Sequence, residues 1–316
     1  MKVRKLTKRG LVKESLIEDR IEDFLRFAEA KGNTKDTLNS HRYALGELFL
    51  KSDVRWNDFD SVRRRVQKLL IGVSDSYYNK RLSAYKQFFS YCIDQGALEK
   101  NPASEFKYRR PTVQVVNHDE EAVRKFMGTI DQTTFAGLRD YTFCLMLLDT
   151  GIRPSEALQI CPEDFDEEKR LIHVRAEYAK TRTERYLPLS VQLIHAVNKL
   201  LGYRPAEWKK TVPVLSSYDG KPLPARGMQS RFRSYARVSG VEITPYHLRH
   251  LFAIGYVRNG GDAFSLQQIM GHVGLEMTKV YVKLNQQDVA LKHAEASPLG
   301  NFVRSKRVKA IKKNGR

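Results

Sequence analysis

The hydrophobic pattern of this chain breaks near residue 101, and this break constrains the fold more than any other feature. Residues 101–116 contain Pro102 and Pro111, with three basic residues between them. Prolines interrupt regular structure, and an exposed basic stretch between two periodic regions is typical of a linker. The length of 316 residues also favours two domains, because single hydrophobic cores rarely grow beyond about 250–300 residues. We therefore predict two domains joined by a basic linker at 101–116.

The part before the break, residues 14–100, is predicted to be a four-helix domain. Apolar residues recur there near the helical period of about 3.6 residues. Gly32 ends the first helix, and Asn33 or Thr34 can cap the second. The fourth helix is expected at 74–95.

Three basic residues, Lys80, Arg81 and Lys86, fall between aromatic positions of this fourth helix. For any one of them, a solvated face opposite the core is the ordinary interpretation. As a group beside a small helical bundle, they would suit phosphate contacts that position DNA without reading its sequence.

The part after the linker is predicted to combine helices with a small β-sheet. Two short β-rich segments, 171–175 and 186–189, indicate a hairpin. Helical patterns surround them, at about 118–130, 135–150, 190–202, 226–239, 244–259, 263–271 and 276–296. The fold class is therefore mainly α with a small β-sheet, and the second domain is of the α+β type.

Both ends of the chain are basic. Residues 1–13 are expected to form a basic N-terminal extension, and because no apolar segment follows them they do not predict a signal peptide. The tail 298–316 includes a run, 304–313, with six basic and no acidic residues, which is expected to lack regular structure in isolation. No stretch reaches the roughly 18 apolar residues of a membrane span, so we expect a cytoplasmic protein without membrane contacts.

The charge of the chain indicates an anionic partner. Fifty-five Lys and Arg against 36 acidic residues give a formal net charge of +19. Such an excess costs self-repulsion unless an anion offsets it, and nucleic acid is the commonest partner of a basic domain of this size. A ribosome-associated or membrane-surface protein would share this composition. The three cysteines are too few and too scattered for a disulfide framework or a zinc knuckle.

Two segments of the second part each hold a cation in a constrained setting. In TGIRPSEAL (150–158), Arg153 stands just before Pro154, which suits the first position of a helix. An arginine held there is well placed to bind an anion together with free backbone N–H groups, although a surface arginine near a cap would look the same. In AKTRTERYLPL (179–189), Lys180 lies in the predicted hairpin turn, where a solvated lysine is the ordinary interpretation.

Two further segments follow in the last third of the chain. In TPYHLRHLFA (244–253), Arg249 lies among apolar residues, and partial burial of a guanidinium group demands an anionic partner. We interpret the adjacent His250 as a core histidine. In the segment 269–284, Gly271 ends a helix, His272 lies in the turn, and Tyr281 follows nine residues later, where it could equally be a core aromatic residue.

The order and spacing of these four segments resemble the signature boxes of the tyrosine recombinase, or phage integrase, family. The resemblance covers 117–297, which it identifies as a catalytic domain. The helical segment 14–100 also resembles the core-binding, or SAM-like, domain of that family. The resemblance implies that the catalytic residues are Arg153, Lys180, Arg249, His272 and Tyr281.

Two supporting positions complete the comparison with the family. Glu156 stands three residues after Arg153, where the family usually has an acidic residue that supports the arginine. Tyr246 stands three residues before Arg249, where the family typically has a histidine. Because neighbouring residues on a helix point about 100° apart, we expect Tyr246 to share the site with Arg249 and His247 to face away.

The resemblance implies a DNA strand-joining reaction through a 3′-phosphotyrosyl intermediate. Two arginines would stabilise the extra charge of a pentacoordinate phosphate, Tyr281 would be the nucleophile, and Lys180 would protonate the leaving 5′ oxygen. This scheme needs no metal ion, ATP or other cofactor. It implies double-stranded DNA as the partner and a homotetramer in the synaptic complex.

Two alternatives remain open at this stage. A type IB topoisomerase-like enzyme would use the same chemistry to nick and reseal one strand. A DNA-binding regulator would keep the fold without the reaction. The complete set of five residues argues against the regulator, and the helical segment after Tyr281, suited to subunit exchange, argues against the topoisomerase.

Overall fold

The computed structural model describes residues 3–110, 118–179 and 181–272, together with Gly274, Thr278 and Tyr281, and it describes side chains from Ile17 onward. The chain forms two compact units, Met1–Val113 and Gln114–Arg316, and each is treated by itself. None of the helices in the described residues is long and apolar enough to cross a membrane.

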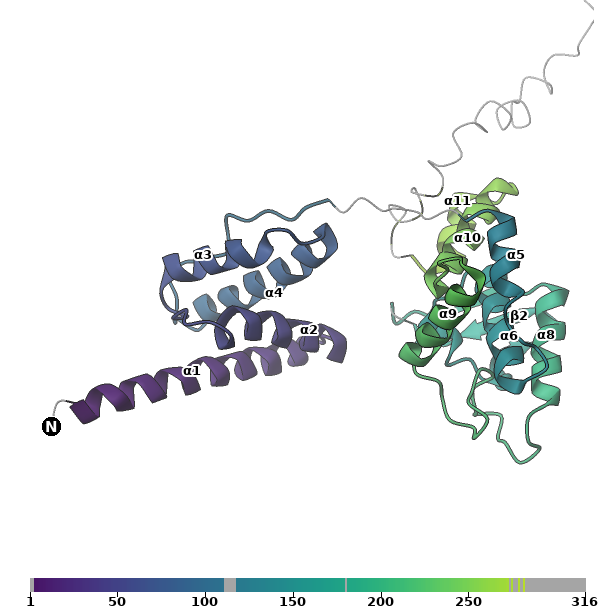
Figure 1. Cartoon of the computed structure of the whole chain (residues 1–316), viewed down its shortest axis with the longest axis horizontal. Helices are drawn as coiled ribbons and strands as arrows, with labels where there is room; N and C mark the ends of the chain where they lie inside the picture. The colour runs from purple at the N-terminus through teal and green to yellow at the C-terminus, as the bar shows by residue number, and fades with distance from the viewer. Residues whose placement is uncertain are drawn as a thin grey trace, which may run out of the picture. The chain divides into compact units, whose positions relative to one another are not determined.

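The first unit is helical, as expected (Figure 1). Phe24, Leu45 and Phe88 belong to its buried core. Thr34 caps the second helix by accepting a hydrogen bond from the Thr37 backbone. The elements are α1 (Val3–Ala30), α2 (Lys35–Leu45), a π-helical turn (Gly46–Leu50), α3 (Phe59–Leu70) and α4 (Asp75–Asp94).

Two features of this unit differ from the expectation. Helix α1 begins at Val3 rather than near residue 14, which is compatible with a lysine- and arginine-rich sequence because both residues are good helix formers. Arg81 is not on a solvated face of α4. It is buried, forms an ion pair with Glu47, and donates a hydrogen bond to the Leu69 carbonyl at 2.7 Å. The buried guanidinium therefore serves the packing of the bundle.

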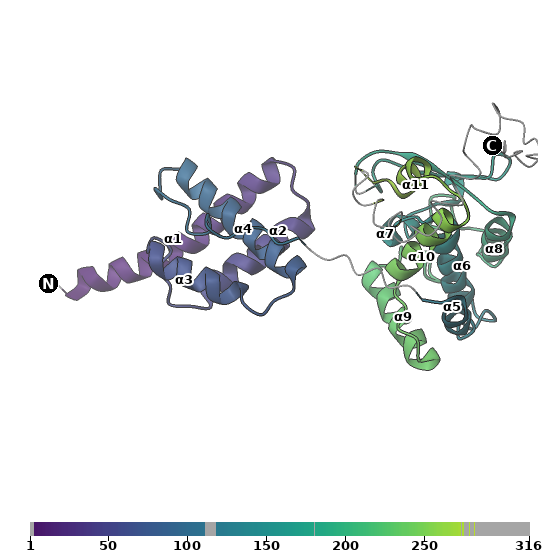
Figure 2. The same cartoon turned by 90° about the horizontal axis from the view of Figure 1, so that it is seen from above.

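The second unit surrounds α6 (Phe135–Thr150), whose Phe143, Met146 and Leu147 are fully buried. Helix α6 packs against α8 (Val191–Gly202) and α10 (Pro245–Arg258), an arrangement that can be followed in Figures 1 and 2. The remaining helical elements are α5 (Glu120–Met127), α7 (Pro154–Ala157), a 3-10 turn (Pro162–Asp164), α9 (Ala225–Ser239) and α11 (Ala263–Met270).

A small antiparallel sheet lies beside these helices. It has the order β1 (Phe165–Asp166), β2 (Leu171–Val174) and β3 (Arg185–Pro188). The predicted hairpin is confirmed as β2 and β3. The pattern missed β1, since two residues are too short to show an alternation. The helix expected at 276–296 falls outside the described residues apart from Thr278 and Tyr281, both of which have helical backbone.

Candidate active site

The first part of the site is the turn between α6 and α7. Helix α6 ends at Gly151, whose left-handed φ of 60° favours glycine. A side chain at Gly151 would also clash with the Phe252 ring. Arg153 is the residue before α7 and Pro154 is its first residue, as predicted. Because α7 has only four residues, its dipole is small, and the positive charge at this turn comes mainly from Arg153.

Glu156 of α7 is fully buried between two guanidinium groups. Its Oε1 accepts a hydrogen bond from Arg153 Nη1 at 2.9 Å, and its Oε2 accepts one from Arg185 Nη2 at 2.5 Å. The backbone N–H of Arg153 also donates to Oε2, at 3.1 Å. Burial raises the pKa of Glu156, but the two guanidinium groups outweigh burial and hold this pKa below its ordinary value. The carboxylate is therefore ionised and fixes both arginines.

Arg185 of β3 is a site residue that the sequence reasoning missed. Besides binding Glu156, its Nε donates to the Ile269 carbonyl of α11 at 3.0 Å. A signal for it exists in the alternation of β3, because Arg185 and the buried Leu187 are two residues apart and so share one face. A basic residue on the same inward face of a strand as a core leucine indicates a buried ionic contact.

Arg249 of α10 is buried and reaches the same region. Its Nη1 donates to the Gly151 carbonyl, and its Nη2 donates to the Met270 carbonyl at 2.8 Å. Arg153 Nη2 donates to the neighbouring carbonyl of Gly271 at 2.6 Å. Burial, followed by the charge of Arg153, lowers the pKa of Arg249 to about 10, so Arg249 remains a cation at neutral pH. The two arginines thus meet at the C-terminal end of α11, where helix carbonyls lack intrahelical partners.

His272 lies directly after this helix end and is buried. Its Nε2 is 3.3 Å from Arg249 Nη2, and its Nδ1 is 3.0 Å from Thr278 Oγ1. Arginine can only donate, so Nε2 accepts and the proton is on Nδ1. Burial, followed by the charge of Arg249, lowers the pKa of His272 to about 4. The ring is therefore neutral near pH 7.

Tyr281 is only 5% exposed and packs with Ile254, Val257 and Met270. Its Oη is 2.5 Å from Nδ1 of His250. Burial raises the pKa of Tyr281, and the charge of Arg249 partly opposes this rise. The interpretation of His250 as an ordinary core histidine was incomplete, because its ring is only partly buried and contacts the tyrosine hydroxyl.

The remaining predicted positions are less enclosed. Lys180 lies outside the described residues. Tyr246, in the first turn of α10, is 50% exposed and borders a cavity of about 380 Å³ together with Pro154 and Ser155 of α7. The adjacent His247 points elsewhere, since its Nδ1 is 3.2 Å from Nε2 of His118.

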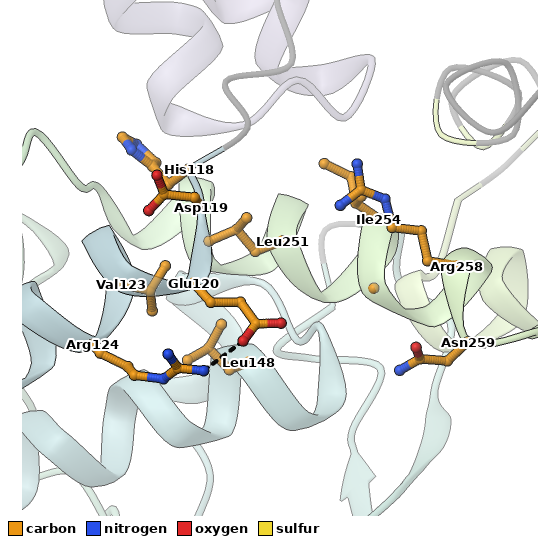
Figure 3. A pocket seen from close by; sticks show the side chains of 11 residues that line it. His118, Asp119, Glu120, Val123, Arg124, Leu148, Leu251, Ile254, Arg258 and Asn259 are labelled. Atoms are coloured by element: carbon orange, nitrogen blue, oxygen red, sulfur yellow. Dashed lines mark hydrogen bonds and ion pairs between the residues drawn. The ribbon is translucent and has the colours of Figure 1, made fainter.

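Two further hollows flank the second unit. One of about 710 Å³ borders the site and is lined by Arg185, Gly271 and His272 together with other hairpin and α11 residues. Another of about 710 Å³ lies among α5, α6 and α10 (Figure 3). This second hollow, with a Glu120–Arg124 ion pair on α5, holds none of the proposed site residues. Among the described residues, no three histidine, cysteine or carboxylate side chains gather as metal ligands would.

The geometry brings together a cationic pair, a neutral imidazole and a phenol from segments far apart in the sequence. Arg153 and Gly271, for example, are separated by 118 positions and in direct contact. Guanidinium groups in a fixed arrangement suit the oxygens of a phosphate, and a phenol nearby is a possible nucleophile. The arrangement can therefore bind a phosphate ester and attack it.

The chain is similar in sequence to integrases and tyrosine recombinases. The model of the phage integrase family matches residues 117–288. The tyrosine recombinase XerC of Chlamydia pneumoniae is 29% identical, over 76% of this chain and 78% of the relative. XerA of Pyrococcus furiosus is 24% identical, over 92% and 98%.

Solved structures show the same fold. The integrase of transposon Tn1549, in complex with transposon right end DNA, is similar with a TM-score of 0.70, at 20% identity over 87% of this chain and 98% of that one. A lambda integrase dimer bound to a core site is similar with a TM-score of 0.68, at 15% identity over 82% and 96%.

Proposed function

The chain belongs to the phage integrase family and is a site-specific DNA recombinase, and from this premise we propose that it joins strands through a covalent bond between Tyr281 and a DNA 3′ phosphate. The observation that supports this assignment is that Arg153, Arg249 and His272 meet at the end of α11. Tyr281 belongs to the same region, because the charge of Arg249 influences the pKa of its phenol. Neither the topoisomerase-like nor the regulator alternative is favoured, because the relatives found are recombinases.

The two arginines are proposed to bind the non-bridging oxygens of the scissile phosphate. The diester carries one negative charge and its pentacoordinate transition state about two, so fixed cations stabilise the transition state more than the ground state. Glu156 holds Arg153 in place before DNA binds. Less conformational entropy is therefore lost when the guanidinium group binds the phosphate. The neutral His272 is a hydrogen-bonding partner of Arg249 and is proposed to keep that guanidinium oriented.

Attack by Tyr281 would produce an aryl phosphate ester. A phenolate leaves more readily than an alkoxide, so the ester conserves the energy of the broken bond, and a DNA hydroxyl can reverse the step without ATP. Lys180 is proposed to protonate the leaving 5′ oxygen. The scheme uses no metal ion.

We propose double-stranded DNA as the partner and four copies of the chain in the synaptic complex. In support, the structural neighbours include a lambda integrase tetramer bound to a Holliday junction. Residues 14–100 are proposed to be the core-binding domain, 101–116 the linker, 117–297 the catalytic domain and 298–316 a basic tail. The exposed Lys80 and the partly exposed Lys86 remain candidates for phosphate contacts.

Recovery of covalently bound DNA tests the proposed function directly. Protein–DNA adducts would be purified from cells under denaturing conditions and their DNA sequenced. We expect one recurring sequence with its break at a fixed position, because a recombinase acts at defined sites. A broad distribution of unrelated sequences would contradict site-specific recombination. The recovered sequence also supplies the substrate for the experiments below.

Tyr246 is predicted to donate a hydrogen bond to the phosphate in place of the usual histidine. Removing one such donor typically costs on the order of 10²-fold in rate. Tyr246→Phe should therefore slow cleavage by about that factor, and Tyr246→His should remain active. His247→Ala is the matched control, since His247 faces His118, and it should cleave near the wild-type rate. If His247→Ala is the slow variant and Tyr246→Phe is not, the two roles are exchanged.

A further inference from the structure

The contact between His250 and Tyr281 is the closest polar contact that the structure gives the proposed nucleophile. Nδ1 of His250, on α10, lies 2.5 Å from Oη of Tyr281, and the two ring centroids are 5.7 Å apart. Within the described residues, the phenol oxygen has no other hydrogen-bonding partner. The hydroxyl is thus held by a single imidazole nitrogen.

The proton of this contact belongs to the tyrosine. Burial, followed by the charges of Arg249 and His247 on the same helix, lowers the pKa of His250. Burial raises the pKa of Tyr281, which faces the imidazole from the segment after α11. At neutral pH the phenol is therefore protonated and donates to an unprotonated Nδ1, which is the arrangement a general base requires.

The other groups that the structure describes around the phenol are unsuited to take this proton. Arg249 is a cation and has no acceptor. Both nitrogens of His272 already have partners, Nε2 at Arg249 and Nδ1 at Thr278. Among the described histidines, only His250 touches the tyrosine oxygen.

We propose that His250 is a catalytic residue, the general base that removes the phenolic proton as Tyr281 attacks phosphorus. This inference rests on the proposed role of Tyr281 as the nucleophile. As the Oη–H bond breaks, an Nδ1–H bond forms, and the Oη–phosphorus bond forms as the bond from phosphorus to the 5′ oxygen breaks. The leaving oxygen takes its proton from Lys180. In rejoining, the imidazolium returns its proton to the departing phenolate.

The test compares covalent adduct formation in a single turnover on a suicide substrate carrying the recovered site. His250→Asn places an amide oxygen near the position of Nδ1, so it keeps a hydrogen-bond acceptor but removes the base. We expect at least about 10²-fold slower cleavage at pH 7, the range typical of general bases. His247→Asn, on the same helix, is the control and should stay within about threefold of wild type. DNA affinity and thermal unfolding establish that each variant is folded.

A second readout separates this role from a structural one. A substrate with a 5′-bridging sulfur needs no proton on its leaving group, so it should restore cleavage by Lys180→Ala. It should not restore His250→Asn, whose defect lies in the nucleophile. Raising the pH should speed His250→Asn, because hydroxide then replaces the missing base. The wild-type rate should level off once His250 is unprotonated.

The proposal is overturned if His250→Asn cleaves within threefold of wild type, or if the sulfur substrate restores it. If the asparagine variant does not fold, His250→Gln repeats the comparison with a longer amide. Tyr281→Phe separates a failure of the proposed nucleophile from a failure of the proposed base. An adduct formed by Tyr281→Phe would rule out Tyr281 as the nucleophile. An inert Tyr281→Phe beside a fully active His250→Asn would overturn only the role of His250.

Discussion

Tyr281→Phe is expected to form no covalent adduct with DNA while it binds the site with nearly wild-type affinity. The substitution removes the attacking oxygen and keeps the aromatic ring that packs with Val257 and Met270. Adduct formation would be measured by denaturing electrophoresis after incubation with the suicide substrate, and affinity by a binding titration.

A matched control lies in the same apolar cluster. Tyr256 packs against it from α10, so Tyr256→Phe also removes one hydroxyl from a tyrosine of this cluster. We expect Tyr256→Phe to form adducts normally. A normal yield of adduct from Tyr281→Phe would contradict the assignment of the nucleophile.

Glu156→Gln is expected to lower the free energy of unfolding of the second unit by about 3–5 kcal/mol. Removing one member of a buried ionic group leaves the other charges uncompensated, and here both Arg153 and Arg185 lose their carboxylate. The chain has two tryptophans, Trp56 in the first unit and Trp208 in the second. In a Trp56→Phe background, the fluorescence of Trp208 during urea unfolding reports on the second unit alone.

Glu120→Gln is the control for this experiment. Glu120 pairs with Arg124 across one helical turn, but its side chain is 86% exposed. Exposed pairs contribute at most about 1 kcal/mol, so the loss should be small. A loss at Glu156 no larger than that at Glu120 would contradict the proposed function of the buried carboxylate.

The contribution of Glu156 to the free energy of unfolding should decrease as the pH falls. Its pKa in the folded state lies below the ordinary value, because the two guanidinium groups outweigh burial. The ionised carboxylate therefore stabilises the fold above the unfolded pKa of about 4.3, and this stabilisation is lost as the pH falls through the folded pKa. The difference in the free energy of unfolding between wild type and Glu156→Gln should accordingly become smaller in acid, which the same urea experiment measures.

The part of the fold that depends on periodicity was predictable. Amphipathic helices such as α8 and α9 repeat their buried positions near the helical period, and the cap residue Thr34 marks the start of α2. The start of α1 was not predictable in this way, because a basic stretch can continue a helix without an apolar pattern. The strand β1 was too short to leave an alternation.

The site was predictable where residues lie in local motifs. Arg153 precedes a proline that starts a helix, and His272 follows a glycine that ends one. Long-range contacts leave no such local sign. The pairing of Arg185 with Glu156 and of His250 with Tyr281 depends on how separate elements pack, and Arg81 was assigned to solvent for the same reason.

The most direct test of the central claim is to locate the covalent bond in the wild-type protein. After trapping on a suicide substrate, the adduct would be digested with protease and nuclease, and the modified residue identified by mass spectrometry. The account predicts a nucleotide joined through its 3′ phosphate to the Tyr281 oxygen. A nucleotide attached to any other residue, or joined through a 5′ phosphate, would contradict it.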